Sequence, residues 1–319
     1  MKRGSKVVVI GGGTGIFSVL SGLKNYPLEI TAIVSMADDG GSTGILREEF
    51  GILPPGDVRR ALVALSFEEE LLCRLFNYRF ERGDLKGHNF GNIFITALCK
   101  IFNDDFEKAI EATGKILNIK GKVIPVTLDK ARLCARLENG KVIVGETNID
   151  IPKHNPELKI KKVFLRPKCK INPRAKKAIL DADFIVIGPG DLYTSIIPNL
   201  LVKGVPEAIK KSKAKKVYIC NLMTKYGETN GFGAIDFVNE IENYLGKNIL
   251  DFVILNKKRP PEKILKKYGK KKVFFVEYRK EDFKDKRFKI IKENLLRRGE
   301  LIRHDSKKIA KLIFNLIKS

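Results

Sequence analysis

The stretch that decides the fold is VVVIGGGTG at residues 7–15, where an apolar run ends directly in a cluster of glycines. Glycine has no side chain to clash, so the backbone can turn sharply and leave consecutive N–H groups free to face a phosphate. The residues that follow carry apolar side chains at Ile16, Val19 and Leu23, which is the spacing of one helix face. We therefore predict a strand, a glycine turn and a helix whose N-terminus attracts an anion.

The glycine cluster fits neither of two common nucleotide-binding patterns. The dinucleotide pattern needs a third glycine where this chain has Ile16, and the sequence holds no lysine-bearing phosphate loop of the ATPase kind. A tight turn without any ligand would use the same glycines, and a nicotinamide dehydrogenase stays an alternative. The pattern favours a phosphorylated or nucleotide-like ligand.

Length and composition narrow the class of protein. A chain of 319 residues can bury a substantial core, and we expect a single domain over residues 1–319. Five cysteines without a C-x-x-C pair and three separated histidines argue against a zinc cluster and a disulfide framework. Neither a signal sequence nor an apolar run of about 18–20 residues is found. We expect a soluble, cytoplasmic protein without a membrane span.

The net charge of +24 is concentrated in the basic C-terminal part, residues 251–319, which holds 23 Lys and Arg against 9 Asp and Glu. Such a patch attracts polyanions through counterion release. No RNA-binding aromatic signature or recognition helix accompanies it, however. A lysine-rich surface with mixed-charge networks explains the surplus equally well. We therefore do not expect nucleic acid as a partner.

Strand-like apolar runs recur along the chain with helical segments between them. The runs are residues 6–10, 30–34, 184–187, 217–221, 252–256 and 273–276. Several are apolar throughout, as strands buried on both faces are. The alternation predicts an α/β fold with a Rossmann-like, mostly parallel sheet and helices on both faces.

Three segments depart from this alternation or end it. Residues 57–118 are predicted to be mostly helical. Within them, the expected core positions are Leu62, Leu65, Leu71, Leu72, Leu75 and Phe76. Residues 122–166 contain Asn139-Gly140, a strong hairpin signal, and we expect a small antiparallel β insert there. The last helix is expected to begin near Asp305 or Ser306, since either side chain is a good cap.

The loop after the second strand, SMADDGGSTG at residues 35–44, contains two adjacent carboxylates. Asp38 lies 25 residues beyond Gly13, roughly where nucleotide-binding α/β domains place an acid against the ribose. Asp38 and Asp39 could also hold a divalent metal or polarise a hydroxyl. A simple turn that caps the following helix is the alternative.

Further polar loops precede helices or follow strands. GILPPGDVRR at 51–60 offers Asp57 as a cap and two arginines that could reach a phosphate, and GHNFGN at 87–92 places Asn92 at a helix start. GPGDLYTS at 188–195 offers the hydroxyls of Thr194 and Ser195, and another polar loop begins at Asn221. Loops that follow parallel strands gather at one edge of the sheet. We predict that they form one ligand site.

In order, these motifs resemble the YvcK-like gluconeogenesis factor family, of the CofD-like superfamily and related to the 2-phospho-L-lactate transferases of coenzyme F420 synthesis. The resemblance covers about residues 7–256 and resumes at 302–305, and LPPGD at 53–57 and GPGDLYTS are its most specific blocks. It implies a cytoplasmic protein that supports cell shape and wall synthesis on gluconeogenic carbon sources. It also implies binding of a UDP-sugar such as UDP-N-acetylglucosamine, with no established reaction, and leaves a homodimer open.

The resemblance also implies which residues line the pocket. By motif position these are Gly12, Gly13, Thr14, Gly15, Asp38, Asp39, Asn92, Gly190, Thr194 and Asn221, with Tyr268 and Arg303 near the nucleotide-sugar. A guanidinium and a phosphate form a strong charge-assisted pair. The chain departs from the family pattern at Asp191, where serine is usual, and at Lys225-Tyr226, where Gln-Pro is usual.

The related transferases provide the alternative function, and whether the chain is an enzyme stays open. In a transferase, Asp38 or Asp39 would hold Mg²⁺ or activate an acceptor hydroxyl, while backbone amides stabilise phosphate charge. The leading hypothesis is a regulator that binds the UDP-sugar without turnover. It requires no metal and no further cofactor.

Overall fold

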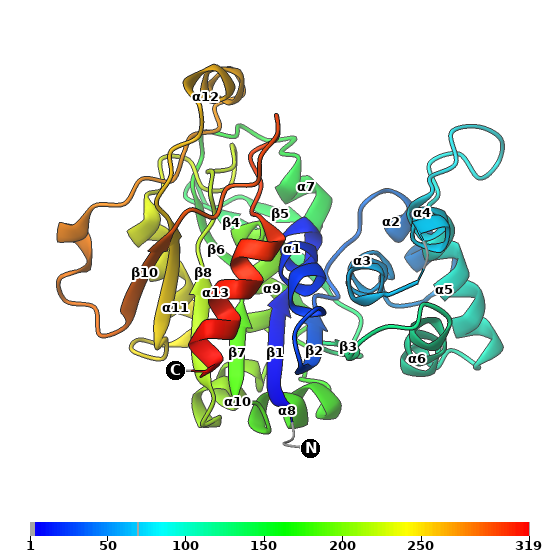
Figure 1. Ribbon diagram of the computed structural model, residues 1–319. Coiled ribbons are helices and arrows are strands. Elements are labelled where there is room, and N and C mark those ends of the chain that lie inside the picture. The colour runs from blue at the N-terminus through cyan, green and yellow to red at the C-terminus, as the bar shows by residue number, and fades with distance from the viewer. Residues whose placement is uncertain (1–3, 69, 319) are drawn as a thin grey trace.

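The computed structural model describes residues 4–68 and 70–318. Its centre is a seven-stranded sheet in the order β10-β9-β8-β7-β1-β2-β3, in which each hydrogen-bonded pair of strands is parallel (Figure 1). The strands are β1 (Ser5–Gly11), β2 (Leu28–Val34), β3 (Lys122–Pro125), β7 (Phe184–Ile187), β8 (Lys215–Ile219), β9 (Phe252–Asn256) and β10 (Lys289–Glu293). The predicted parallel sheet is confirmed.

The strand order explains where a ligand site is expected. From β1 the chain proceeds to β2 and β3 on one side, whereas β7 to β10 extend on the other. The crevice outside the carboxyl ends of strands at such a reversal is where open α/β sheets bind ligands. The ends of β1 and β7 therefore mark the first place to look, along the upper edge of the sheet in Figure 1.

Helices cover both faces of the sheet, as predicted. On one face, α1 (Gly13–Leu23) and α13 (Ser306–Lys318) lie side by side (Figure 1). A Cβ at Gly22 would lie 2.2 Å from the carbonyl oxygen of Ser306, so glycine permits this close approach. The Asp305 carboxylate accepts the N–H groups of Lys307 and Lys308 and caps α13, in agreement with the predicted helix start.

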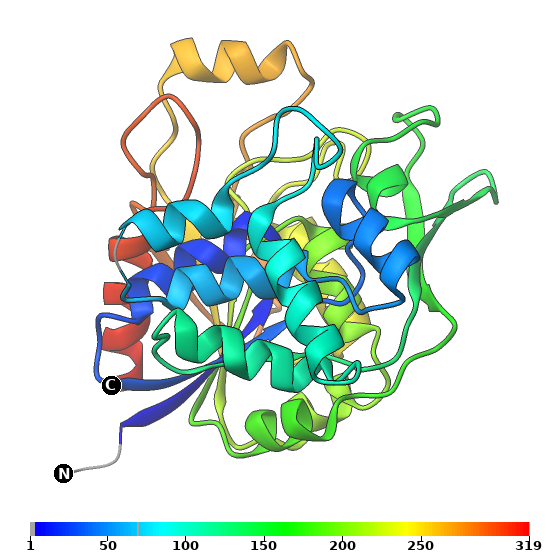
Figure 2. The same cartoon turned by 90° about the vertical axis from the view of Figure 1, so that its right-hand side faces the viewer.

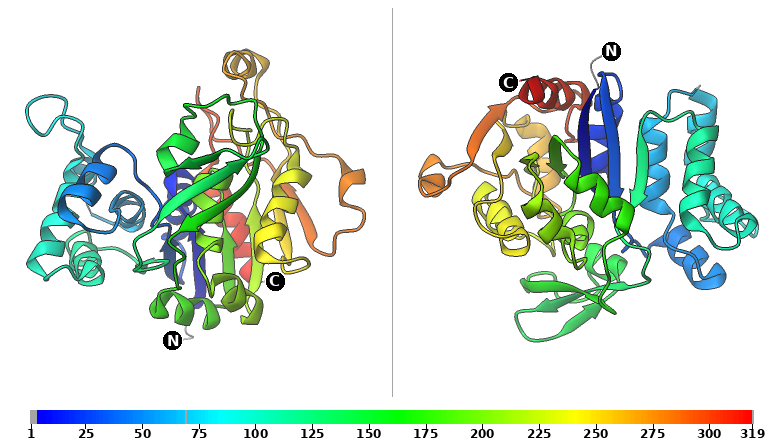
Figure 3. Two further views of the ribbon diagram at one scale, coloured as in Figure 1. Left: turned by 180° about the vertical axis from the view of Figure 1, so that it is seen from behind. Right: turned by 90° about the horizontal axis from the view of Figure 1, so that it is seen from below.

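The other face is covered by a second group of helices (Figure 3). They are α8 (Pro173–Leu180), the π-helical turn η1 (Leu192–Ile196), α9 (Ile197–Leu200), α10 (Val205–Lys211) and α11 (Ala234–Leu245). Two short elements lie outside these layers, α12 (Glu262–Gly269), at the strand-end edge in Figure 1, and η2 (Lys280–Phe283). No helix of the described residues is long and apolar enough to cross a membrane.

A helical block lies beside the β3 edge of the sheet and faces the viewer in Figure 2. Its helices are α2 (Gly41–Phe50), α3 (Gly56–Leu65), α4 (Glu70–Asn77), α5 (Phe90–Ile101) and α6 (Phe106–Ile116). Leu62, Leu65 and Phe76 are buried as predicted. Leu71 and Leu75 are 72% and 40% exposed, so their prediction as core residues is wrong. Both lie on α4, which packs only one of its sides against the block.

The antiparallel insert is present, but it begins later than predicted. It is a three-stranded sheet in the order β5-β4-β6, formed by β4 (Arg132–Leu137), β5 (Val142–Val144) and β6 (Ile160–Arg166), with the short helix α7 (Glu146–Asp150). Residues 122–125 instead form β3, which pairs in parallel with β2 at the edge of the main sheet. The insert lies over the face that carries α8 and α11 (Figure 3).

One predicted strand is absent and an unpredicted strand takes its place. Residues 273–276 contain only an isolated bridge between Phe275 and Met223, because this apolar stretch packs as an irregular loop. The last strand is β10, whose sequence KIIKE combines charged ends with two half-buried isoleucines. An edge strand keeps part of its surface in water and so lacks the continuous apolar run of β1.

Candidate functional site

A pocket of about 160 Å³ lies at the reversal of strand order, and we call it the switch-point pocket. Its walls come from the start of α1, the loop after β7, the loop after β8 and the loop that precedes α13. Among its lining residues are five that the sequence predicts, Thr14, Gly15, Gly190, Asn221 and Arg303. Four segments far apart in the chain thus meet at one point.

The glycines of the first loop are required by close packing. A Cβ at Gly15 would lie 2.0 Å from the carbonyl oxygen of Pro189, and one at Gly12 would lie 2.4 Å from Oδ2 of Asp57. Both distances are far below contact distance, so a larger residue would force the loops apart. Gly13 has a φ of +62°, a left-handed conformation that favours glycine. The turn therefore brings backbone N–H groups close to the pocket.

Asp57 fills part of the anion position that the glycine turn creates. Its Oδ1 accepts the N–H of Gly13 at 2.9 Å and lies 3.0 Å from the guanidinium of Arg60. Asp57 lies inside α3, whose cap position is Pro55, and therefore does not cap its own helix. Because it accepts the N–H of Gly13, it caps α1 instead. The N–H groups of Thr14 and Gly15, in the first turn of α1, have no partner four residues earlier within the helix. These groups are the ones left for a ligand.

Two buried polar atoms at the switch-point pocket have no hydrogen-bond partner among the described residues. They are Oδ1 of Asn221 and Nε2 of His304. The Asn221 side chain is held in place because its Nδ2 donates to the carbonyl oxygen of Gly190 at 2.7 Å. Burial lowers the pKa of His304 to about 4, so its ring is neutral at pH 7. Buried polar groups are normally satisfied, and such exceptions often mark where a ligand or water binds.

Arg303 and Tyr268 belong to the same corner of the molecule. Arg303 is exposed and lines the switch-point pocket from the loop before α13. The Tyr268 hydroxyl, on α12, accepts the N–H of Ile302 at 3.1 Å. Tyr268 thus contacts the backbone next to Arg303 and fixes that loop, although it is not among the residues that line the pocket.

A group of acids, Asp38, Asp57 and Glu146, lies next to the glycine turn, and we call it the acidic group. Burial raises the pKa of Asp38 to about 6, and the negative charge of Asp57 contributes. Burial, together with Asp38 and other nearby acids, raises the pKa of Glu146 to about 9. Arg60 pairs with Asp57 and partly offsets this charge. At neutral pH the group therefore holds a proton on Glu146 and remains close to titration at Asp38.

Asp39 has a different environment from Asp38. Its Oδ1 accepts the N–H of Thr147 at 2.8 Å, and its Oδ2 accepts the N–H of Glu146 at 3.1 Å. Asp39 therefore caps α7 and ties the insert to the loop after β2. The alternative considered from the sequence is that this turn caps the helix that follows it, α2. The helix that Asp39 caps is instead α7.

Asn92 and Thr194 are both buried and lie behind the loops that face the ligand site. Nδ2 of Asn92 is 3.3 Å from the hydroxyl of Thr43, which in turn hydrogen-bonds Asp38. Oγ1 of Thr194 donates to the Glu228 carboxylate at 3.2 Å. Both residues hold neighbours of the site in position.

A second set of acids surrounds Lys225. The ammonium lies 2.9 Å from Asp191 and 3.1 Å from Glu228, and it also contacts Asp150 of the insert. The three carboxylates are close enough to hold a metal ion, but the ammonium of Lys225 already lies among them. Asp191 and Lys225 are two positions at which we expect the chain to differ from the family that it resembles. The structure shows that these departures form an ion pair.

The predicted residues therefore fall into groups along one edge of the sheet. The switch-point pocket is lined by Thr14, Gly15, Gly190, Asn221 and Arg303. Gly12 and Gly13 directly precede Thr14 in the chain, and both contact Asp57. The other predicted residues, Asp38, Asp39, Asn92, Thr194 and Tyr268, lie around this centre and not in its lining.

Sequence reasoning missed the roles of Asp57, Glu146 and His304. Asp57 lies in the specific LPPGD block and His304 directly follows Arg303, so both had a sequence signal. Glu146 had no sequence signal, because it lies beside Asp38 only once the insert packs against the loop after β2.

Comparison with known proteins agrees with this fold. The family described as 2-phospho-L-lactate transferase CofD matches residues 7–296. The gluconeogenesis factor of Bacillus subtilis is 42% identical over 322 residues and both chains are covered completely. A Thermotoga maritima protein, provisionally given the same name, is 48% identical over 97% of this chain and 98% of its own. A crystal structure of a UPF0052 family member from Bacillus halodurans has a TM-score of 0.93 at 43% identity, covering 98% of this chain and 99% of that one.

Proposed function

The chain belongs to the 2-phospho-L-lactate transferase CofD family, and from this premise we propose that it binds a UDP-sugar, such as UDP-N-acetylglucosamine, without turning it over. Its relatives named gluconeogenesis factors match it from end to end. In this proposal the protein is a cytoplasmic regulator that supports cell shape and wall synthesis during growth on gluconeogenic carbon sources. Its five cysteines are free thiols, which suits a reducing compartment.

The observation that carries the proposal is the pair of buried, unpartnered atoms Asn221 Oδ1 and His304 Nε2 at the switch-point pocket. The first turn of α1 and the Arg303 guanidinium lie at the same pocket and together favour a diphosphate. Asn221 can accept a hydrogen bond from a uracil N–H or a sugar hydroxyl. At about 160 Å³ the pocket suits the diphosphate, while the rest of the ligand extends over the surrounding loops.

Calorimetry with UDP-N-acetylglucosamine, UDP-glucose and UDP tests the proposal. The wild type should bind with a one-to-one stoichiometry, and the ligand should be recovered unchanged. Asn221→Ala should weaken binding about tenfold, since losing a hydrogen bond in a desolvated site costs about 1–2 kcal/mol. Asn315→Ala, on the exposed side of α13, is the matched control and should bind like the wild type. Absence of heat with all three ligands would contradict the proposal.

A transferase is the second candidate, and the raised pKa of Asp38 favours it. A carboxylate with a pKa of about 6 can accept a proton from an acceptor hydroxyl near neutral pH. Asp39 is less suited, because both of its oxygens cap α7. Mg²⁺ would supply charge stabilisation for the transferred phosphate. The candidate predicts a product detectable by mass spectrometry from a nucleotide-activated donor, lost in Asp38→Asn and kept in Glu49→Gln. A blank over a wide acceptor panel rejects it.

A further inference from the structure

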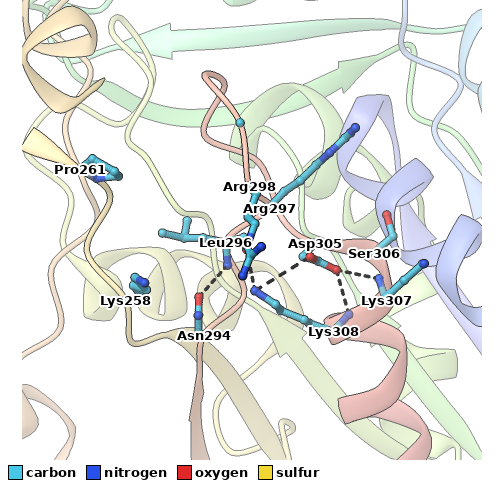
Figure 4. A pocket seen from close by; sticks show the side chains of 11 residues that line it. Lys258, Pro261, Asn294, Leu296, Arg297, Arg298, Asp305, Ser306, Lys307 and Lys308 are labelled. Atoms are coloured by element: carbon cyan, nitrogen blue, oxygen red, sulfur yellow. Dashed lines mark hydrogen bonds and ion pairs between the residues drawn. The ribbon is translucent and has the colours of Figure 1, made fainter. Parts of the chain in front are cut away.

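A second and larger cavity, of about 870 Å³, opens beyond the carboxyl ends of β9 and β10 (Figure 4). Six of its lining residues define what we call the basic pocket: Lys258, Asn294, Arg297, Arg298, Lys307 and Lys308. Arg297 and Arg298 come from the loop before α13, and Lys307 and Lys308 come from the first turn of α13 itself. The cavity thus collects cations from three segments at the strand-end edge.

Among the described residues, one carboxylate, that of Asp305, also lines this cavity, and it is already engaged. Asp305 Oδ1 accepts the N–H groups of Lys307 and Lys308, at 3.0 and 3.1 Å, as the cap of α13. The Lys308 ammonium lies 3.9 Å from Asp305 and donates to the carbonyl oxygen of Leu296 at 2.8 Å. Asp305 therefore offsets only one of the five positive charges of the lining.

The other four cations, Lys258, Arg297, Arg298 and Lys307, have no ion pair within the part of the chain that the structure describes. Neighbouring cations of the same basic segment behave differently, since Lys257 pairs with Glu293 at 3.4 Å. A surface of mixed-charge networks would show such pairs at the pocket as well. Unpaired like charges around one cavity repel each other, and a bound polyanion relieves that repulsion.

The lining indicates which polyanion fits. None of the described residues that line the cavity is aromatic, so it lacks the aromatic platform on which single-stranded nucleic acids stack their bases. Guanidinium groups match phosphate oxygens in a two-pronged geometry, and Arg297 and Arg298 bring two of them to the lining of the cavity. The volume far exceeds that of a single phosphate. We propose that the basic pocket binds an oligophosphate of three or more linked phosphates, either free or as the tail of a nucleotide.

This site is separate from the UDP-sugar site but shares a wall with it. The N–H of Arg297, beside the basic pocket, donates to the carbonyl oxygen of Arg303 at 2.9 Å, and Arg303 lines the switch-point pocket. An isolated bridge also joins Leu296 to His304 across the same loop. The two pockets lie on the two sides of one hairpin-like segment, and the oligophosphate site does not depend on UDP-sugar binding.

Calorimetric titration with tripolyphosphate at about 0.15 M salt, where long-range attraction is screened, tests the inference. The wild type should bind one tripolyphosphate, and Arg297→Ser/Arg298→Ser should weaken binding at least tenfold. Lys280→Ser/Lys284→Ser removes the same charge from η2 and the residue after it, outside the pocket, and should change the affinity less than twofold. Arg303→Ser should retain tripolyphosphate binding, which distinguishes this site from the UDP-sugar site.

Comparing ATP with tripolyphosphate as ligands separates the two sources of the phosphate. Tighter binding of ATP than of tripolyphosphate assigns the site to a nucleotide tail, and the reverse assigns it to free oligophosphate. No binding by the wild type, or equal losses in both double variants, would overturn the inference. So would an RNA that binds more tightly than tripolyphosphate. Arg297→Ser/Arg298→Ser should still bind UDP-N-acetylglucosamine if the proposed function holds, and it should unfold cooperatively in either case.

Discussion

The acidic group and the basic pocket occupy the same edge of the sheet yet have opposite charge. Asp38, Asp57 and Glu146 lie where β1 and β2 end, whereas the unpaired lysines and arginines gather beyond β9 and β10. The acids are largely buried, and burial raises the pKa of Asp38 and of Glu146. The cations instead line an open cavity.

This difference shows that the strand-end edge of the sheet provides pockets, whereas the charge of the residues that line each pocket determines which ligand it suits. Buried acids lower their own charge by holding protons, so they are suited to exchange protons and to respond to pH. Cations in an open cavity remain charged and are suited to polyanions. The switch-point pocket lies between the two, with Arg303 on one side and Asp57 joined to its glycine turn on the other. Five variants test the charges along this edge of the sheet.

The largest effect is expected from Asp57→Ala. The change removes the acceptor of the Gly13 N–H and the partner of Arg60, both in a buried setting. Loss of a hydrogen-bonded buried charge of this kind should lower the free energy of unfolding by about 2–3 kcal/mol. Urea unfolding followed by circular dichroism measures it, with Asp84→Ala in an exposed loop as the control. A loss no larger than the control's would mean that Asp57 does not hold the glycine turn.

The next effect concerns Lys225→Gln, which removes the cation among Asp150, Asp191 and Glu228. Glu228 is fully buried, and its pKa, raised to about 7 by burial, should rise further when the ammonium is lost. We expect a loss of about 2 kcal/mol in unfolding free energy, below the value for a fully buried pair because Asp191 is partly exposed.

A second change, at the partner position Asp191, sharpens this test. Asp191→Ser/Lys225→Gln should recover about 1 kcal/mol relative to the sum of the two single changes, because the two side chains pair with each other. A double-mutant cycle in urea gives the coupling. Strict additivity would show that the two side chains contribute to stability independently.

A smaller effect is expected from the pH dependence of Glu146. Its pKa of about 9 in the folded protein lies above the ordinary value of 4.5, so the folded state keeps a proton that the unfolded chain releases. The free energy of unfolding should therefore fall as pH rises between these two values. Glu146→Gln removes this dependence and should exceed the wild type by roughly 1 kcal/mol at pH 8. This is far less than the full pKa difference would give, because Glu146 is only half-buried and solvent screens its charge. Glu49→Gln, on the exposed side of α2, should follow the wild-type profile.

The sequence was a good guide wherever the signal lay within a few residues. The buried strand and glycine turn at residues 7–15 and the cap Asp305 each carry their pattern locally. Strand β10 was missed because an edge strand keeps charged side chains in water, and residues 273–276 were wrongly predicted because an apolar loop looks like a buried strand.

Features that depend on tertiary convergence could not be predicted in the same way. The partners of Lys225 come from the insert, from the loop after β7 and from the segment after β8. Glu146 lies on α7, which Asp39 caps, and so joins the acidic group from a distant part of the chain. The basic segment had a clear compositional signal, yet composition does not say which lysines pair and which surround a cavity. The charge contrast between the two regions is therefore a property of the fold.

The smallest expected effect concerns the basic pocket and is measured as a change in the stability of the unliganded protein. Removing two unpaired like charges should relieve repulsion, so Arg297→Ser/Arg298→Ser should stabilise the unliganded protein by about 0.5 kcal/mol at an ionic strength of about 0.01 M. Salt at about 0.5 M should abolish the gain because it screens exposed charges. Thermal unfolding at both ionic strengths measures the difference, with Lys280→Ser/Lys284→Ser as the charge-matched control. If both double variants gain equally, the repulsion belongs to the whole basic segment and is not focused at the cavity.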